Sequence, residues 1–387
     1  MKRITFPLLM LLLCMTAFAQ SPDFKILYGP YLQNVTTNEA TVVWVTSHNA
    51  VSWIEVRPND GTTFFDEAVV PRFYEDVDGR HKFGTVHRVT ITGLQPGTSY
   101  RYRLCSKEVT ALENYYVGYG KVRAIQATRN TTFRTLDTTK TKISFAVLND
   151  VHENNEALEK LLKQEDLGAL DFVFYNGDMV SNMFNEKQVF DGFINTSVKL
   201  FASHLPFFLA RGNHETRGQF GNEYMNYFPT PTGHPYYTFR QGPVFFIVLD
   251  AAEDKPDNHD EYHGIVDYDK YRAQEAEWLK KVVASDECRQ APVRIVFMHI
   301  PPYPPAGYGD IQANKLFVPL LNQMGVDLML SGHTHRYAYY PKGEGGDCQF
   351  PLLINGARQL LHVDVDGKQI SMHITTVDGK SFKDIKL

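Results

Sequence analysis

The sequence predicts a two-domain protein in which an all-β unit precedes an α/β domain. The chain has 387 residues, which is more than one typical domain requires. Residues 24–137 contain short strand-like runs separated by turns, and over residues 141–387 strands alternate with helices. Hydrophobic residues make up 43% and charged residues 21%, so the composition excludes a disordered or collagen-like chain.

Residues 1–19 are predicted to form a secretory signal peptide. Lys2 and Arg3 precede the apolar run Phe6–Leu13, and the small residues of Ala17-Phe18-Ala19 fit a signal peptidase site. We therefore expect cleavage after Ala19 and a secreted or periplasmic protein. The apolar run is shorter than the ~20 residues of a membrane span, so no span is expected after cleavage. The alternative is a buried N-terminal helix.

Charge and cysteine content narrow the possible partners. A net charge of −5 gives no electrostatic reason to expect a nucleic-acid duplex as a partner. The three cysteines after the signal, Cys105, Cys288 and Cys348, allow at most one disulfide, and their spacing does not say which pair would form it. None has metal-finger spacing, so we expect small core residues. The oligomeric state is not predicted.

The N-terminal unit is predicted to be a β-sandwich. The segment Leu94–Tyr102 resembles the turn and next strand of fibronectin type III domains, in which a tyrosine, here Tyr100, ties the corner to the backbone. Residues 106–130 are expected to be an irregular, long hairpin insertion. The expected strands are Ile26–Leu32, Ala40–Thr46, Ser52–Val56, His87–Thr92 and Thr131–Leu136.

After a polar linker at residues 137–141, the alternation of elements predicts an α/β domain with a strand-rich tail. Expected strands are Lys142–Asn149, Asp171–Tyr175, Phe207–Ala210, Val244–Leu249, Val293–Met298, Val326–Leu330, Leu352–Ile354, Leu360–Val365 and Ile370–Thr376. Expected helices are Asn155–Lys163, Lys187–Ala202, Tyr268–Ala284 and Ala313–Met324. Asp366-Gly367 is a strong hairpin turn between the last two strands.

Polar residues follow five of the predicted strands of the second domain. They are Asp150 and His152, Asp178, Asn213 and His214, His299, and His333 and His335. Ligands of open α/β sheets bind beyond the carboxyl ends of the strands, so we expect one mixed oxygen and nitrogen site. Such a set suits divalent transition metals such as Zn, Mn, Fe or Co. Each motif alone has an ordinary reading as a turn or a capping residue, and their joint occurrence favours a metal centre.

The motif set resembles the calcineurin-like metallophosphoesterase superfamily, whose pattern is D-x-H, GD, GNH[DE], H and GHxH. The resemblance covers roughly residues 142–340. Gly29-Pro30 and the Leu94–Tyr102 segment resemble the fibronectin-like domain that precedes the catalytic domain in purple acid phosphatases. The resemblance implies an α/β/β/α four-layer domain over residues 141–387.

The same resemblance implies two metal ions, divalent or of mixed valence (Fe, Zn or Mn), that share one bridging carboxylate. The first ion would have the ligands Asp150, His152, Asp178 and His335, and the second Asp178, Asn213, His299 and His333. His214 would protonate the leaving group or stabilise the transferring phosphoryl group, and Glu215 would orient His214. The remaining histidines, including His87, are expected in surface or capping roles.

Two positions depart from the purple acid phosphatase pattern. The tyrosine that binds ferric iron in GDxxY is here Ser181, and the first motif reads Asp150-Val151-His152 instead of D-x-G. We therefore expect His152 to take the place of the tyrosine as ligand. Neither a purple ferric centre nor an acidic pH optimum follows from the resemblance.

The resulting hypothesis is a secreted, metal-dependent phosphoesterase that acts on a phosphorylated small molecule or a nucleotide. A phosphomonoesterase is favoured, with attack by a water molecule that a dinuclear centre activates. One alternative is a phosphodiesterase or nucleotidase that uses the same site. An alternative of another class is a non-catalytic surface-binding protein whose metal domain is vestigial. Specificity depends on loops outside the motifs, so the alternatives stay open.

Overall fold

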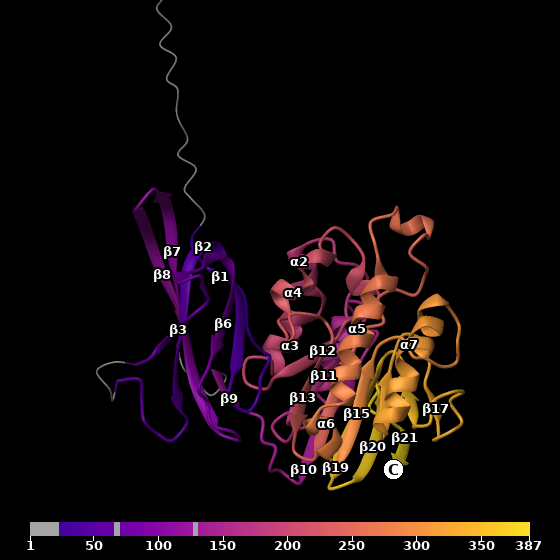
Figure 1. The fold of residues 1–387 in the computed structure, drawn as a ribbon. Coiled ribbons are helices and arrows are strands. Elements are labelled where there is room, and N and C mark those ends of the chain that lie inside the picture. The colour runs from indigo at the N-terminus through magenta and orange to yellow at the C-terminus, as the bar shows by residue number, and fades with distance from the viewer. Residues whose placement is uncertain (1–22, 66–69, 127–130) are drawn as a thin grey trace, which may run out of the picture.

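The computed structural model describes residues 23–65, 70–126 and 131–387, and shows a β domain beside a larger α/β domain (Figure 1). The predicted signal peptide and its cleavage site lie outside the described residues. Among the helices that are described, none combines the length and the apolar character that a membrane crossing requires.

The predicted β-sandwich is confirmed as a β domain organised around one long strand. Over Ala40–Val45 the strand β2 pairs with β1 and β6, and over Ala50–Pro58 it pairs with β7. One strand therefore connects two sets of strands. The bounds are β1 (Ile26–Gln33), β2 (Ala40–Pro58), β3 (Arg72–Tyr74), β4 (Asp76–Val77), β5 (Arg80–His81), β6 (Phe83–Ile91), β7 (Ser99–Glu113), β8 (Tyr116–Ile125) and β9 (Thr132–Arg134).

Three details of the β domain bear on the sequence-based expectations. The two strands expected at Ala40–Thr46 and Ser52–Val56 are one continuous strand. The expected long hairpin is confirmed as the antiparallel pair of β7 and β8, which is extended along most of its length and interrupted by register shifts around Val109. The predicted corner is confirmed, since the backbone N–H of Gln95 donates to Tyr100 Oη at 2.8 Å.

The α/β domain contains two six-stranded sheets. The first has the strand order β12-β11-β10-β19-β20-β21, and the second β13-β14-β15-β16-β18-β17. Strands of the first sheet are β10 (Lys142–Leu148), β11 (Phe172–Asn176), β12 (Phe207–Ala210), β19 (Gln359–Asp366), β20 (Gln369–Thr376) and β21 (Ser381–Lys386). Strands of the second are β13 (Tyr237–Gln241), β14 (Val244–Leu249), β15 (Val293–Met298), β16 (Leu328–Ser331), β17 (Ala338–Tyr340) and β18 (Leu352–Ile354).

The two sheets pack face to face through aromatic side chains. Phe174 of β11 stacks on Phe297 of β15 with ring centroids 3.5 Å apart, and Phe145 of β10 meets Phe246 of β14 edge to face at 5.5 Å. Helices cover both outer faces, so the predicted four-layer arrangement is confirmed. The helices are α1 (Asn155–Leu162), α2 (Glu186–Val189), α3 (Asn195–Leu200), α4 (Tyr224–Tyr227), α5 (Tyr268–Val283), α6 (Asp286–Gln290) and α7 (Tyr308–Met324).

Helix α7 begins earlier than expected, at Tyr308 instead of Ala313. Its start is fixed by the buried Asp310, whose Oδ2 accepts from the backbone N–H groups of Ala306 at 2.6 Å and Gly307 at 2.8 Å. The expected helix over Lys187–Ala202 consists of α2 and α3 joined by one wider helical turn over residues 190–194. Strands β13, β17 and β21 were not expected from the sequence.

The β domain is fastened to the α/β domain by buried polar contacts. Tyr31 Oη donates to the carbonyl oxygen of Tyr227 at 2.9 Å, and Tyr102 Oη donates to that of Ser203 at 2.8 Å. The ring of Tyr28 stacks on Phe190 at 4.2 Å. The backbone N–H of Leu32 donates to the carbonyl oxygen of Ala202 at 2.9 Å, which places β1 along the segment that leads into β12. All three described cysteines are free thiols, and Cys288 and Cys348 are buried as expected for core residues.

Candidate metal centre

The eight residues predicted for the site lie together at one edge of the two sheets. Strands β10, β11 and β12 run parallel in one sheet and β15 and β16 run parallel in the other, so their carboxyl ends meet. Potential ligand atoms within 4.8 Å of one another form three groups, namely Asp150, His152 and His335; His152, Asp178 and His214; and Asp178, His299 and His333. Asn213 joins the third group, because its Oδ1 lies 3.0 Å from His333 Nδ1.

The loops that carry these residues have an unusual backbone. Left-handed φ angles occur at Asp150 (51°), His152 (46°), Asp178 (55°), His333 (69°) and His335 (59°). Each such residue costs on the order of 1–3 kcal/mol and persists only where the surrounding structure enforces it. Backbone strain at five residues that follow the three strands β10, β11 and β16 therefore marks this edge of the sheets as a functional site.

Close packing explains the glycine in each motif. A Cβ atom on Gly177 would lie 2.4 Å from His299 Nδ1, and one on Gly212 would lie 2.2 Å from Asp178 Oδ1. A Cβ atom on Gly332 would lie 2.9 Å from Asp150 Oδ2. The glycines thus let neighbouring loops approach closely enough for the polar side chains to meet.

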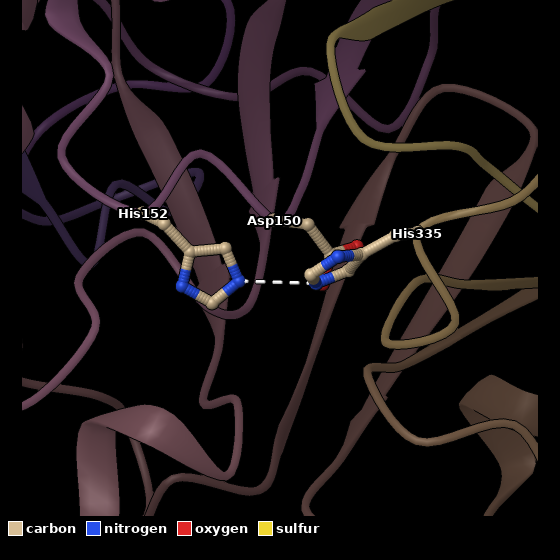
Figure 2. A group of neighbouring side chains, drawn as sticks. All are labelled: Asp150, His152 and His335. Carbon is tan, nitrogen blue, oxygen red and sulfur yellow. Dashed lines mark hydrogen bonds and ion pairs between the residues drawn. The ribbon is translucent and has the colours of Figure 1, made fainter.

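Asp150, His152 and His335 form the outer group, in which the two imidazole rings turn toward each other (Figure 2). The two Nε2 atoms are 3.1 Å apart, and His335 Nε2 lies 3.4 Å from Asp150 Oδ1. The hydrogen bond with Asp150 raises the pKa of His335, whereas burial lowers the pKa of His152. The His335 side chain is 53% exposed, so this group is open to solvent.

Asp178, His299 and His333 form the inner group, in which Asp178 and His299 are each only 1% exposed. His299 Nε2 is 3.0 Å from Asp178 Oδ2, and His299 Nδ1 is 2.7 Å from the Asn176 carbonyl oxygen. Burial by itself would lower the pKa of His299, but the carboxylates of Asp178 and Asp150 raise it to about 10. Burial would raise the pKa of Asp178, and His299 more than offsets this, so that pKa is lowered.

The residues of both groups fit a pair of transition-metal ions. Asp150 Oδ2 accepts from Asn149 Nδ2 at 2.6 Å and from the His333 N–H at 3.0 Å, which aims Oδ1 at the centre. Asp150 Oδ1 and His299 Nε2 are buried, and within the part of the chain that the structure describes their polar neighbours, His335 Nε2 at 3.4 Å and Asp178 Oδ2 at 3.0 Å, are not aligned for a hydrogen bond. A cation between them would satisfy both atoms and would replace the proton on His299.

His214 lies beside the centre and is held at two points. Its backbone N–H donates to Asp178 Oδ1 at 3.0 Å, and its Nδ1 is 2.7 Å from the Ser181 carbonyl oxygen. Because a carbonyl can only accept, Nδ1 carries a proton and Nε2 faces the centre, 3.8 Å from Asp178 Oδ2. Ser181, at the position of the purple acid phosphatase tyrosine, therefore contributes its backbone to orienting His214.

The expected role of Glu215 is wrong. Its carboxylate does not pair with the His214 ring but accepts from four backbone N–H groups at 2.7–3.3 Å, those of Asp178, Met179, Val180 and Gly212. Burial, together with the nearby Asp178, raises the pKa of Glu215 to about 7. Glu215 thus ties the loop after β11 to the loop after β12.

Four further residues support the site and were not expected from the sequence. Asn355 Nδ2 donates to Asn149 Oδ1 at 2.9 Å, which links the ends of β18 and β10. Arg217 Nη1 is 3.1 Å from His214 Nε2, and the Arg217 Nε donates to Glu253 Oε1 at 2.6 Å. Asn149, Glu253 and Asn355 also follow strands closely, so the rule that found the other residues would have selected them.

Two family models match the chain. The model described as calcineurin-like phosphoesterase matches residues 143–337, and the model described as the purple acid phosphatase N-terminal domain matches residues 30–135. Purple acid phosphatase 15 of Arabidopsis thaliana is 25% identical over 286 residues, which are 66% of this chain and 49% of that protein. Acid phosphatase type 7 of Homo sapiens is 25% identical over 315 residues, 75% of this chain and 63% of that protein.

The chain thus spans between about half and two thirds of the length of these two relatives. A solved purple acid phosphatase from yellow lupin (Lupinus luteus) seeds has the same fold, with a TM-score of 0.65 at 16% identity over 92% of this chain and 73% of that one. The chain therefore belongs to the calcineurin-like phosphoesterase family, and its N-terminal part matches the purple acid phosphatase N-terminal domain.

Proposed function

We propose that this protein is a secreted phosphomonoesterase with a dinuclear metal centre, acting on phosphorylated small molecules or nucleotides. The observation that carries the proposal is the meeting of all seven predicted ligands and His214 at one edge of the sheets, where the buried ligand atoms Asp150 Oδ1 and His299 Nε2 form no well-aligned hydrogen bond with a described residue. A vestigial centre would be expected to have lost at least one of these side chains.

The ligands fall into two overlapping sets. The resemblance implies an outer set of Asp150, His152, Asp178 and His335 and an inner set of Asp178, Asn213, His299 and His333. In support, Asp150 lies within ligand distance of His152 and His335, and Asp178 lies within ligand distance of His152 and, separately, of His299 and His333. Two ions held in this way would polarise the phosphate ester and provide a nucleophilic water at neutral pH. Asp178 would belong to both sets and would be the bridging residue. Mn, Zn and Fe all suit this donor set.

His214 is proposed to act on the leaving group. Its Nδ1 proton is held by the Ser181 carbonyl oxygen, so a proton for the departing alkoxide has to be carried on Nε2. Nε2 lies 3.1 Å from the donor Arg217 Nη1 in this structure, so Nε2 takes up that proton only when Nη1 turns away from it, toward the phosphate. Glu215 keeps the loop of His214 at a constant distance from Asp178. In this proposal Nδ1 and the loop position the His214 ring, and Nε2 transfers the proton.

Purified residues 20–387 loaded with Mn, Zn or Fe should hydrolyse generic phosphomonoesters. A parallel panel of phosphodiesters and nucleotides decides between a monoesterase and the alternative phosphodiesterase or nucleotidase. Absence of turnover with all three metals, in protein shown to contain two metal equivalents, would reject the enzymatic proposal.

The variant His214→Ala should lower kcat by about 10²–10⁴ while metal content is retained, because it removes the proton donor and no predicted ligand. The exposed His234 provides a control, since His234→Ala should leave kcat unchanged. Full activity of the His214 variant would show that another group donates the proton.

Secretion has a separate test. When the full chain is expressed in a cell with a general export pathway, N-terminal sequencing of the exported protein should begin at Gln20. Retention of an intact N-terminus inside the cell would contradict this part of the proposal.

A further inference from the structure

Arg217 stands between the metal centre and a neighbouring cleft. Its Nη1 lies 3.1 Å from His214 Nε2, the atom that faces the centre. The same side chain lines a cleft of about 980 Å³ whose walls come from residues 216–222 and from the segment of residues 253–271. The cleft therefore adjoins the site on the side of His214.

The guanidinium of Arg217 is fixed before any substrate arrives. Its Nε and Nη2 donate to the two carboxylate oxygens of Glu253 at 2.6 and 3.0 Å, and the Glu253 side chain is fully buried. Thr216 Oγ1 donates to the same carboxylate at 3.2 Å. The two hydrogen bonds to Glu253 occupy the Nε and Nη2 edge of the planar guanidinium, and Nη1 points toward His214. A hydrogen-bond donor is therefore preorganised beside the place where a phosphate would lie.

The walls of the cleft are suited to a ring without charge. The half-buried Tyr268 and the 87% exposed Ile265 supply aromatic and apolar surface, to which Tyr262, only 8% exposed, adds little.

The exposed carboxylates of Glu261 and Asp267 stand on the same wall, where they pair with Lys255 at 3.2 Å and Lys270 at 3.8 Å. Arg211 also lines the cleft and pairs with the buried Asp250. Because the charges of the wall are held in ion pairs, the cleft favours an uncharged group over a second phosphate group.

We propose that Arg217 Nη1 contacts the phosphate of the bound ester and that the cleft holds its leaving alcohol, an uncharged group that contains a ring. The inference rests on the proposed function and adds a substrate class to it: monophosphate esters of neutral aromatic or sugar alcohols. No bond is formed by Arg217, which supplies a fixed cationic donor. Contacts between the ring of the leaving alcohol and the cleft would add binding energy outside the metal centre.

The first experiment measures binding of inorganic phosphate to metal-loaded protein by calorimetry, at metal content verified for each variant. Arg217→Gln should weaken the affinity by about 10- to 100-fold. Because this change leaves Glu253 buried without its partner, the double variant Arg217→Gln with Glu253→Gln serves as a second form, with the same expected loss. Arg103 is the matched control, since it is 21% exposed and pairs with a glutamate, as Arg217 does at 25%.

Unchanged phosphate affinity in both Arg217 variants would overturn the assignment. Weakened phosphate affinity in the Arg103→Gln control would also overturn the assignment, because the loss of affinity would then not be specific to Arg217. If wild-type protein shows no turnover but the Arg217 variants lose phosphate, the enzymatic proposal fails and the binding role of Arg217 stands. If the wild-type protein shows turnover and the Arg217 variants bind phosphate as tightly as the wild type, the enzymatic proposal stands and the binding role of Arg217 fails.

The second experiment compares esters by kcat/KM. Wild-type protein should prefer an aryl phosphate to methyl phosphate, and Ile265→Ala should reduce this preference by about 3- to 10-fold. Ile311→Ala, at a 52% exposed position on α7 outside the cleft, should leave it unchanged. An equal preference in wild type and Ile265→Ala would show that the leaving group lies elsewhere.

Charge on the cleft wall is tested with fructose 6-phosphate and fructose 1,6-bisphosphate. The wild type should favour the monophosphate, and the double variant Glu261→Gln with Asp267→Asn should narrow the difference. A wild-type preference for the bisphosphate would contradict the proposed substrate class.

Discussion

Two buried histidines, one in each domain, have opposite proton affinities. His87 on β6 is 4% exposed, and its Nε2 lies 2.9 Å from the hydroxyl of Thr46. His299 at the end of β15 is 1% exposed and faces the carboxylate of Asp178. Burial lowers the pKa of His87 to about 4, whereas Asp178 and Asp150, working against burial, raise that of His299 to about 10.

The difference shows that the neighbouring group, and not the degree of burial, decides whether a buried histidine ring favours its neutral or its charged form. Burial disfavours the charged ring in both domains. In the β domain the neighbouring hydroxyl is neutral, so the ring stays neutral and serves as a core residue beside Trp44. In the α/β domain two carboxylates favour a cation, whether a proton or a metal ion. The expected surface or capping role of His87 is therefore wrong.

The largest effect should come from removing the carboxylate that faces His299. Asp178→Asn eliminates the residue shared by both ligand sets, so turnover should fall by about a thousandfold or more and bound metal should drop. Turnover, elemental analysis and thermal unfolding are measured together. Asp286→Asn, at a 79% exposed position, is the control. Full metal content and full activity of the Asp178→Asn variant would show that Asp178 is not a ligand of the metal centre.

His87 should make the protein sensitive to acid. Its pKa is about 4 when folded against 6.5 for the free side chain, so between these values the unfolded chain binds a proton that the folded chain excludes. Stability is thus fully present above pH 6.5 and is lost as pH falls, by about 3 kcal/mol at pH 4.

The acid sensitivity is measured as the slope of unfolding free energy against pH. His87→Gln should flatten this slope between pH 4 and 6.5, whatever its effect at neutral pH, while the exposed His234→Gln should not. An identical slope in wild type and His87→Gln would mean that His87 is protonated in the folded state.

The inner and outer groups of the centre should differ in metal affinity. His299→Ala removes a fully buried nitrogen and should weaken metal binding by about 100-fold, whereas His335→Ala removes a 53% exposed one and should weaken it by about tenfold. Competition with a chelator gives both constants. A larger loss for His335 would place the tighter ion in the outer group.

The smallest effect should come from the neutral partner of His87. Thr46→Val keeps the shape of the side chain but removes the hydroxyl, which should cost about 1–2 kcal/mol of unfolding free energy and leave turnover unchanged. Urea unfolding measures the loss. A change in kcat instead would indicate that the β domain acts on the centre.

Local pattern was sufficient to predict the fold class and the meeting of the motif residues. Strand runs that each end in a polar residue bring those residues to one edge once the strands are parallel, because all parallel strands end on the same side. The glycines of the motifs could also be understood from local sequence, since they precede residues that must approach a neighbouring loop. The expectation for Tyr100 held for a similar reason, as its partner lies only five residues away.

Tertiary structure alone decided which group each buried side chain meets. Thr46 and His87 are 41 residues apart in sequence, Asn176 and His299 are 123 apart, and Arg217 and Glu253 are 36 apart. These pairings depend on how the sheets and loops pack, and hydrogen-bond and ion-pair energies change steeply within an ångström. The sequence by itself therefore determined that histidines and carboxylates gather at one edge, and packing determined that His299 faces carboxylates that favour a cation while His87 lies in the core beside a neutral hydroxyl.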